Sequence, residues 1–411
     1  MSSRRQRFRQ YMARLSAAAH PREAIKEQLY VPQPGGATAD QLARRLELEP
    51  TSSHLVVGGV GSGKTTQLLM VQQSLAAVHD VHPIFIEVSE KHDLAKLRSG
   101  VLLVLAGLAL GDLVPKTQQS DAVKHARKRF RDWAHGWVEW VDIRDDYAEP
   151  PEPEFEPDDD GRYLRSVHYK GVLVPPEPEL QTDIRKRGEQ LSILRQAVGQ
   201  SHPHVVLLFD SLDRLTDLRP FADVVEQDVR AIKSAGIGVV IVGPLRTLFG
   251  VGRPIADRFD YLYHLASVDV ERDAVGEEFF ARVLRKRVEA ELLPDEALRR
   301  IVQFSGGVLR DLISMARGAG EEAYTAGADR IGLTHVEAAA DSFGRALMLG
   351  LGSDEVEVLQ RVRTKGSFVQ TSDKDIALLV TRRVLEYGNG VRRFAVHPTI
   401  APLLEQLASK S

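Results

Sequence analysis

A glycine-rich run carries the most specific chemistry in the sequence. It reads Gly58-Gly59-Val60-Gly61-Ser62-Gly63-Lys64-Thr65, and Thr66 follows it. Glycines let consecutive backbone N–H groups wrap around an anion where a helix begins. In such a loop the lysine ammonium faces the outer phosphates of a nucleoside triphosphate, and the next hydroxyl ligates magnesium. The run therefore predicts a phosphate loop that binds ATP with Mg²⁺, in which Lys64 is catalytic and Thr65 is a metal ligand.

Two aspartates at the end of an apolar segment are the next candidates. Residues 204–209 (HVVLLF) run directly into Asp210. A carboxylate at the carboxyl end of a buried strand lies where ligands gather in open α/β sheets, so Asp210 is predicted to hold Mg²⁺ through water. Asp213 could orient or deprotonate the attacking water. Alternatively, Asp210 caps a turn and Asp213 pairs with Arg214 or Arg219.

Phosphoryl transfer also needs positive charge around the γ-phosphate, and three arginines are candidates. An arginine supplied by the same or a neighbouring subunit contributes roughly 10³- to 10⁵-fold in rate. Arg246 and Arg258 follow the apolar segment 237–242, and Arg310 opens a later helix. The alternative for each is a solvated or ion-paired side chain.

These residues need a sheet to position them, and the sequence predicts one. Almost wholly apolar segments alternate with helical patterns, which is typical of a parallel sheet covered on both faces. We therefore predict an α/β fold of the P-loop NTPase type with a parallel five-stranded sheet. The predicted strands are 54–57, 83–88, 204–209, 237–242 and 260–265, and the predicted helices between them include 63–78, 93–110 and 221–235.

A long insertion separates the second and third predicted strands. Trp133, Trp137 and Trp140 recur at helical spacing after the basic residues 124–131, which predicts a helix with a tryptophan face. Such a face packs into a core or, alternatively, stacks nucleic-acid bases. Residues 149–160 (EPPEPEFEPDDD) are acidic and proline-rich and cannot pack a core. They predict a flexible surface insertion or, alternatively, an element that binds a partner.

The C-terminal part predicts two further modules. Helical patterns at 273–291, 294–304, 308–326 and 334–349 predict a helical lid domain. Two β-type runs around Gly388-Asn389-Gly390 predict a hairpin, and helices followed by a hairpin suggest a C-terminal winged-helix domain. The predicted division is a basic N-terminal helix at 1–30, an ATPase domain at 31–268 with its insertion at about 115–182, a lid at 269–350 and a winged-helix-like domain at 351–411.

Composition narrows the classes of function. The chain has 411 residues, 43% of them hydrophobic, which suits two or three domains. With 54 Lys and Arg against 57 Asp and Glu, it has no overall cationic field for nucleic acid. It has no cysteine, which excludes disulfides and thiolate chemistry. This absence suits a reducing cytoplasm, where we expect the protein. The longest apolar run, 101–110, is about half of a membrane span, so we predict a buried helix there and no span.

The first twenty residues are basic and contain no acid. Phe8, Tyr11, Met12 and Leu15 fall at helical spacing among five arginines. We predict a basic amphipathic docking helix; the alternative is a segment like an organelle transit peptide.

Taken in order, these motifs resemble the AAA+ ATPases and the related STAND ATPases over roughly residues 25 to 411. The stretch Asp210-Ser211-Leu212-Asp213-Arg214 looks like the STAND form of the Walker B motif, whereas AAA+ proteins carry an acid where Ser211 stands. This departure implies slow hydrolysis with Asp213 as the replacement base. Residues 255–260 are similar to the AAA+ arginine-finger segment, which implies that Arg258 acts in a neighbouring subunit. Residues 305–310 resemble a sensor-2 motif, in which Arg310 contacts the γ-phosphate.

The resemblance implies three functions. The first is a nucleotide-dependent switch that changes assembly or the binding of an unidentified protein partner. The second is a DNA-binding ATPase, an initiator, loader or transposition-type regulator, that forms a homo-oligomer on duplex DNA. Its phosphate contacts would come from the hairpin arginines, among them Arg392 and Arg393. The third is a scaffold that binds ATP without turnover.

Overall fold

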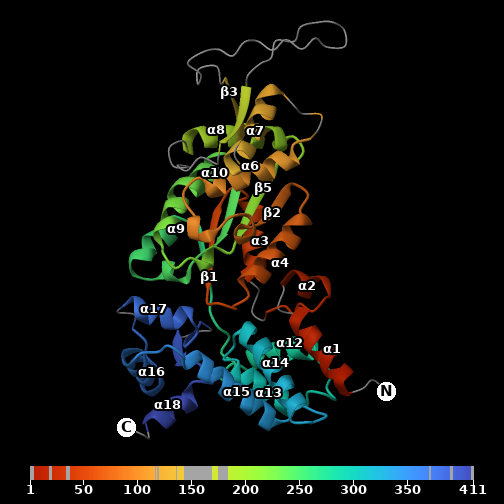
Figure 1. The fold of residues 1–411 in the computed structure, drawn as a ribbon, viewed down its shortest axis with the longest axis vertical. Helices are drawn as coiled ribbons and strands as arrows, with labels where there is room; N and C mark the ends of the chain where they lie inside the picture. The colour runs from red at the N-terminus through yellow and green to blue at the C-terminus, as the bar shows by residue number, and fades with distance from the viewer. Residues whose placement is uncertain are drawn as a thin grey trace, which may run out of the picture.

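The computed structural model places the sheet domain and the helical modules in two halves of the molecule (Figure 1). The sheet and its helices form the upper half, and the lid, the C-terminal helices and helix α1 form the lower half. The residues described are 4–17, 21–33, 38–115, 117, 120–135, 137–142, 169–174, 184–369, 372–388 and 392–408.

The core of the upper half is one parallel sheet of five strands. The strand order is β2-β5-β6-β1-β7, so β1 lies inside the sheet and delivers the glycine run to its carboxyl edge. The five-stranded parallel sheet predicted from the sequence is confirmed. The strands are β1 (Ser53–Gly58), β2 (Val81–Glu87), β5 (His204–Asp210), β6 (Gly238–Val242) and β7 (Tyr261–Leu265).

Side chains of the strands alternate between two apolar cores. Val56, Leu208 and Val240 pack on one face, and Leu55 and Leu207 on the other. Residues one apart in a strand point to opposite faces, so a strand buried on both faces must be apolar throughout. Helices α3 (Thr38–Leu48) and α4 (Lys64–Ala76) cover the first face. The second face is covered by α6 (Val101–Leu113), α7 (Asp121–His135), α8 (Ile184–Gly199), α9 (Arg219–Val224), a π-helical turn (Val225–Val229) and α10 (Arg230–Ser234).

The single helix predicted over 93–110 is wrong in its first half. The chain forms α5 (Val88–Lys91) and a 3₁₀ turn (Leu94–Lys96), and α6 begins only after Gly100. The buried carboxylate of Asp228 accepts hydrogen bonds from Gly100 N at 2.6 Å and Leu102 N at 2.9 Å. A cap from a distant element thus fixes the start of α6, and no local pattern announces it.

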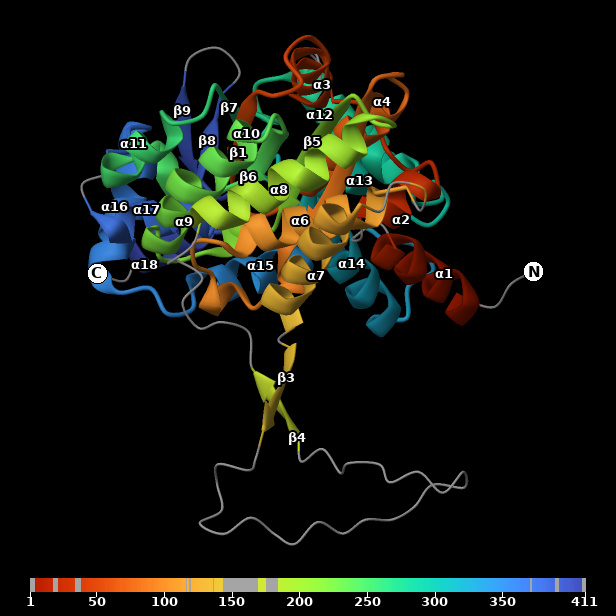
Figure 2. The same ribbon diagram turned by 90° about the horizontal axis from the view of Figure 1, so that it is seen from above.

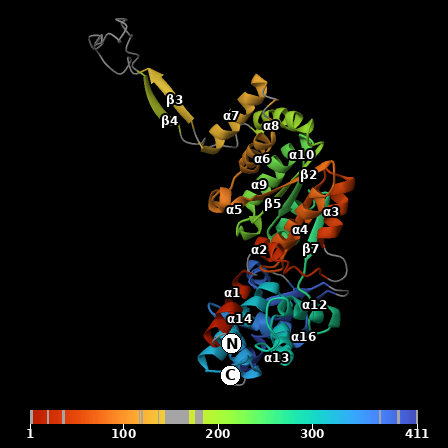
Figure 3. The ribbon, with the colours of Figure 1, turned by 90° about the vertical axis from the view of Figure 1, so that its right-hand side faces the viewer.

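The helix predicted to carry Trp133, Trp137 and Trp140 is also wrong beyond Trp133. Helix α7 ends at His135, and β3 (Trp137–Asp142) then pairs antiparallel with β4 (Tyr169–Val174). Aromatic and β-branched residues in both runs favour strand pairing over a longer helix. The hairpin projects away from the body (Figures 2 and 3). Trp133 alone stays on the helix, edge-on to Phe130. The acidic stretch 149–160 lies outside the described residues.

The lower half contains the predicted helical lid. Its helices are α12 (Ala274–Arg285), α13 (Asp295–Phe304), α14 (Leu309–Thr325) and α15 (Leu333–Met348). The predicted N-terminal helix, α1 (Arg4–Ala17), buries Phe8, Tyr11 and Leu15 in the same core. Tyr11 also donates a hydrogen bond to Ala316 O at 2.6 Å. The basic helix therefore docks on the lid of its own chain, and α2 (Pro21–Lys26) leads from it toward the sheet.

The C-terminal module consists of helices and the predicted hairpin. The hairpin pairs β8 (Val384–Tyr387) with β9 (Arg393–Val396), and its turn residues 389–391 lie outside the described residues. The helices are α16 (Ser353–Lys365), α17 (Asp373–Val380) and α18 (Ala401–Ala408), and short helical turns at 212–214, 245–248, 250–252 and α11 (Arg253–Ala256) connect the sheet. In the described part of the chain, no helix combines the length and apolarity needed to cross a bilayer.

A buried histidine on the strand that leads to the glycine run makes the fold sensitive to acid. His54 is fully buried, 2.7 Å from Ser52 Oγ and stacked on Tyr261. Burial lowers the pKa of His54 from 6.5 to about 4. Between pH 6.5 and pH 4, His54 thus binds a proton in the unfolded chain but stays neutral in the folded protein. The free energy of unfolding is therefore not reduced by His54 above pH 6.5, and it falls as the pH drops toward 4.

We expect the free energy of unfolding to fall by about 3 kcal/mol more in the native protein than in His54→Gln between pH 7.5 and pH 4. Urea unfolding at the two pH values measures this difference. His125→Gln, on the exposed side of α7, is the matched control and should follow the native protein. Parallel losses in the native protein and His54→Gln would contradict the assignment.

Candidate nucleotide-binding site

The glycine run forms a tight loop between β1 and α4. Gly61 and Gly63 have φ of 81° and 94°, a region that favours glycine. A Cβ on Gly58 would lie 2.7 Å from Ser62 Oγ, and a Cβ on Gly61 would lie 2.5 Å from Arg310 Cβ. The backbone therefore has the close-approach geometry that a phosphate cradle requires, and the lid touches it directly.

Lys64 lies inside this loop and is almost completely buried. Its ammonium donates hydrogen bonds to Gly58 O at 2.9 Å and Gly59 O at 2.8 Å. The same Nζ lies 3.0 Å from Asp213 Oδ2. Asp213 thus pairs with the loop lysine rather than with the arginines that were the sequence alternative. The pair brings the two predicted catalytic residues together.

The predicted magnesium ligands also meet at the edge of the sheet. Thr65 donates a side-chain hydrogen bond to Asp210, and Ser211 N donates another at 2.8 Å. Burial raises the pKa of Asp210, and the nearby carboxylates of Asp213 and Glu87 raise it further. The described residues contain no cluster of three His, Asp or Glu side chains for a metal. One hydroxyl and one carboxylate suit Mg²⁺, which usually keeps waters and phosphate oxygens as its other ligands.

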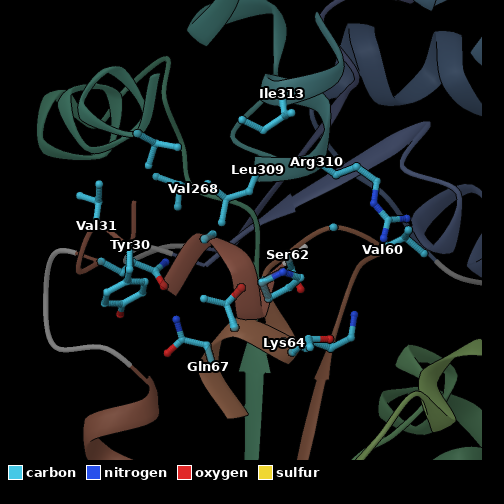
Figure 4. Close-up of a pocket in the computed structure, with 18 of the residues that line it drawn as sticks. Tyr30, Val31, Val60, Ser62, Lys64, Gln67, Val268, Leu309, Arg310 and Ile313 are labelled. Atoms are coloured by element: carbon cyan, nitrogen blue, oxygen red, sulfur yellow. The ribbon is translucent and has the colours of Figure 1, made fainter. Parts of the chain in front are cut away.

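A cavity of about 480 Å³ lies over the loop. Figure 4 shows the loop and Lys64 on one side, Leu309 and Ile313 of the lid opposite them, and Tyr30 and Val31 at one end. The loop and strand-edge residues that line it are Val60, Gly61, Ser62, Gly63, Lys64, Thr65, Thr66, Asp210, Ser211 and Asp213. The cavity is thus lined by polar residues of the loop and also by apolar residues, among them Ile25, Leu29, Phe279 and Phe280.

Sequence reasoning missed part of the lining of this cavity. Tyr30 and Val31 reach it from the segment after α2, and Tyr30 hydrogen-bonds to the Gln67 side chain. Arg287 reaches it from the lid, and burial lowers the pKa of this arginine to about 10. The available signal was the apolar, proline-containing run at 29–33, which stands between two helices and cannot continue either.

The three candidate arginines lie in different surroundings. Arg310 is exposed, lines the cavity and extends along the loop toward Val60 (Figure 4). Arg246 lies 3.5 Å from Asp373 and lines a second cavity of about 170 Å³ beside Gly58–Val60. Arg258 lies 3.1 Å from Glu226 Oε2 and lines neither cavity. The structure therefore brings Arg310 to the predicted site and leaves Arg258 outside it in the same subunit.

Comparison with known proteins finds distant structural likenesses. No family profile matches the sequence, and no curated protein matches it. The ORC2 protein of Aeropyrum pernix, solved in ADPNP–ADP complexes, is 12% identical over 93% of this chain and 97% of its own, with a TM-score of 0.44. The ORC1 protein of the same organism in complex with DNA is 13% identical over 93% and 95%, with a TM-score of 0.45.

A third solved structure, the RuvB Holliday junction branch migration motor of Thermotoga maritima, is 14% identical over 90% of this chain and 95% of its own, with a TM-score of 0.40. Likenesses this distant carry no conclusion about the chemistry of this chain. Its own strand order, glycine loop and lid define an α/β P-loop NTPase fold with a helical lid.

Lys64→Ala should weaken the binding of ATP roughly 100-fold or more, because it removes the one cation inside the loop while the cradle remains. Isothermal titration of Mg–ATP into folded protein measures the change. Lys91→Ala, an exposed lysine on α5, is the control and should bind as the native protein does. Unchanged affinity in Lys64→Ala would refute the phosphate-loop assignment.

Proposed function

We propose that this chain binds ATP with Mg²⁺ between the sheet domain and the lid, hydrolyses it slowly, and acts as a nucleotide-dependent switch of the AAA+/STAND type. One observation carries the proposal. A single cavity is lined by the phosphate loop, by Asp210 and by the lid residue Arg310. A ligand held there touches both halves of the molecule, so its charge state can alter how they pack.

Each proposed phosphate contact follows from the geometry. The loop N–H groups and Lys64 bind the β- and γ-phosphates, and Arg310 adds positive charge from the lid side. Thr65 and Asp210 hold Mg²⁺, which offsets the charge of the phosphate oxygens when bound. Because Asp213 Oδ2 lies 3.0 Å from the Lys64 ammonium, its predicted role as base competes with a role in holding that lysine.

The proposed switch runs from the lid to the C-terminal module. Asp311 follows Arg310 on α14, is buried, and forms an ion pair with Arg382 at 2.5 Å. Arg382 also lines a small cavity together with Gly59 and Val60 of the phosphate loop. Because Asp311 is next to Arg310 in the chain, a movement of Arg310 toward a phosphate also shifts Asp311. It therefore shifts the ion pair through which Asp311 holds Arg382 of the C-terminal module. We propose that this module is a winged helix that responds to the bound nucleotide.

Oligomerisation is proposed from Arg258, whose distance from the cavity of its own chain suits a finger acting in a neighbouring subunit. Arg258→Ala should then bind ATP normally and lose hydrolysis, since the finger acts on the transition state. Mixing Arg258→Ala with Lys64→Ala should restore part of the activity, because the first supplies an intact loop and the second an intact finger. Steady-state ATPase assays on the mixture measure this.

Arg253→Ala, an exposed arginine on α11, is the control and should hydrolyse ATP at the native rate. Light scattering with and without Mg–ATP follows the molar mass in parallel. If the protein stays a monomer and mixing restores no activity, Arg258 does not act in a neighbouring subunit. The switch would then act within one chain.

A DNA-bound form of the enzyme is the second candidate, and the hairpin arginines bear on it. Arg392 pairs with Glu386 at 2.5 Å, and Arg393 pairs with Asp269 at 2.6 Å. DNA phosphates would have to displace these intrachain partners. Duplex binding that falls steeply with salt and weakens in Arg392→Ala would favour this candidate over the protein-binding switch.

A further inference from the structure

A second carboxylate stands beside Asp210 at the edge of the sheet. Glu87 is the last residue of β2 and is paired in register with Asp210, the last residue of β5. Neighbouring strands lie about 4.8 Å apart, and the carboxyl ends of parallel strands share one edge. Glu87 also contributes to the electrostatic field that raises the pKa of Asp210. The strand pairing therefore places Glu87 in the proposed metal and phosphate region.

Ser211 links Glu87 to the nucleotide cavity. Its hydroxyl lies 3.5 Å from Glu87 Oε1, and Ser211 itself lines the cavity. Ser211 is 3% exposed and has φ of 78°, a strained conformation for a residue other than glycine. Such strain persists where the surroundings demand it, and it turns the chain just after Asp210. The AAA+ resemblance expects an acid at this position, and here the acid stands on the next strand instead.

The two acids that flank Asp210 have different partners. Asp213 is committed to the Lys64 ammonium. For Glu87, the described residues offer hydroxyl groups, those of Ser89 and Ser211, both at 3.5 Å, and no ion pair with Lys or Arg. Asp213 is therefore held as the anchor of Lys64. Glu87, which contacts the cavity residue Ser211, is the neighbouring carboxylate left to act as the base.

We propose that Glu87, with Ser211 beside it, is the carboxylate that activates the attacking water. This rests on the proposed ATP hydrolysis. The water oxygen forms a bond to the γ-phosphorus while the bond from that phosphorus to the β,γ-bridging oxygen breaks. The water proton passes to Glu87 and then to solvent, and ADP leaves with the bridging oxygen. The acid thus stands on the strand next to the position at which the AAA+ resemblance expects it.

The test compares Glu87→Gln with Glu90→Gln, an exposed neighbour on α5 that carries the same charge change. Removing a general base costs roughly 10²- to 10⁴-fold. We expect Glu87→Gln to slow single-turnover hydrolysis about 100-fold or more while the Kd of Mg–ATP stays within about twofold of native. We also expect the pH–rate profile of the native protein to have an acid limb from a carboxylate base, and Glu87→Gln to lack it. Glu90→Gln should match the native protein in rate and affinity.

A double variant that exchanges the residue types at positions 87 and 211 distinguishes a loss of catalysis from a loss of structure. Glu87→Ser combined with Ser211→Glu returns an acid to the position after Asp210, and it should hydrolyse ATP faster than Glu87→Ser alone. The inference is overturned if Glu87→Gln keeps the native rate, loses ATP affinity in step with rate, or keeps the acid limb. A native protein that binds Mg–ATP without hydrolysing it also overturns it. A native protein that does not bind Mg–ATP refutes the proposed function itself.

Discussion

The close approach of the lid to the phosphate loop is the constraint on which the site depends. Gly61 allows it, because any side chain there would collide with Arg310 at 2.5 Å. Gly307 allows the second approach, since a Cβ on it would lie 1.7 Å from Val268 O. Both glycines have positive φ, so neither position suits another residue. These two contacts bring Arg310 and the apolar lid residues over the loop and close the cavity.

The charges at the sheet edge fit a metal-bound ligand better than a bare anion. The carboxylates of Glu87 and Asp213 both act electrostatically on Asp210, and the buried Lys64 ammonium lies 3.0 Å from Asp213. Three carboxylates would repel an uncompensated triphosphate, whereas Mg²⁺ reverses the local field. This charge balance supports the proposed binding of ATP together with Mg²⁺ rather than of the nucleotide alone.

Local patterns predicted the parts of the fold and site that depend on neighbours in sequence. The glycine run, the apolar strands and the lid helices are of this kind. The tryptophans misled because Trp137 and Trp140 fit a helix face as well as a short strand, and pairing with β4 decided the outcome. Glu87 and Tyr30 were not found because their importance comes from strand order and from a segment that folds back over the loop.

Helix α14 connects the phosphate loop with the N-terminal helix α1. Its first turn carries Arg310, and its last turn offers the Ala323 and Tyr324 carbonyls to the Arg4 guanidinium of α1. With 17 residues, the helix is a rod roughly 25 Å long. A tilt of about 10° at the loop end would swing its far end by about 4 Å. Because Phe8 and Tyr11 of α1 share one core with α14, such a tilt would carry the N-terminal helix with it, so that a change at the phosphate loop would be transmitted to the far end of the lid.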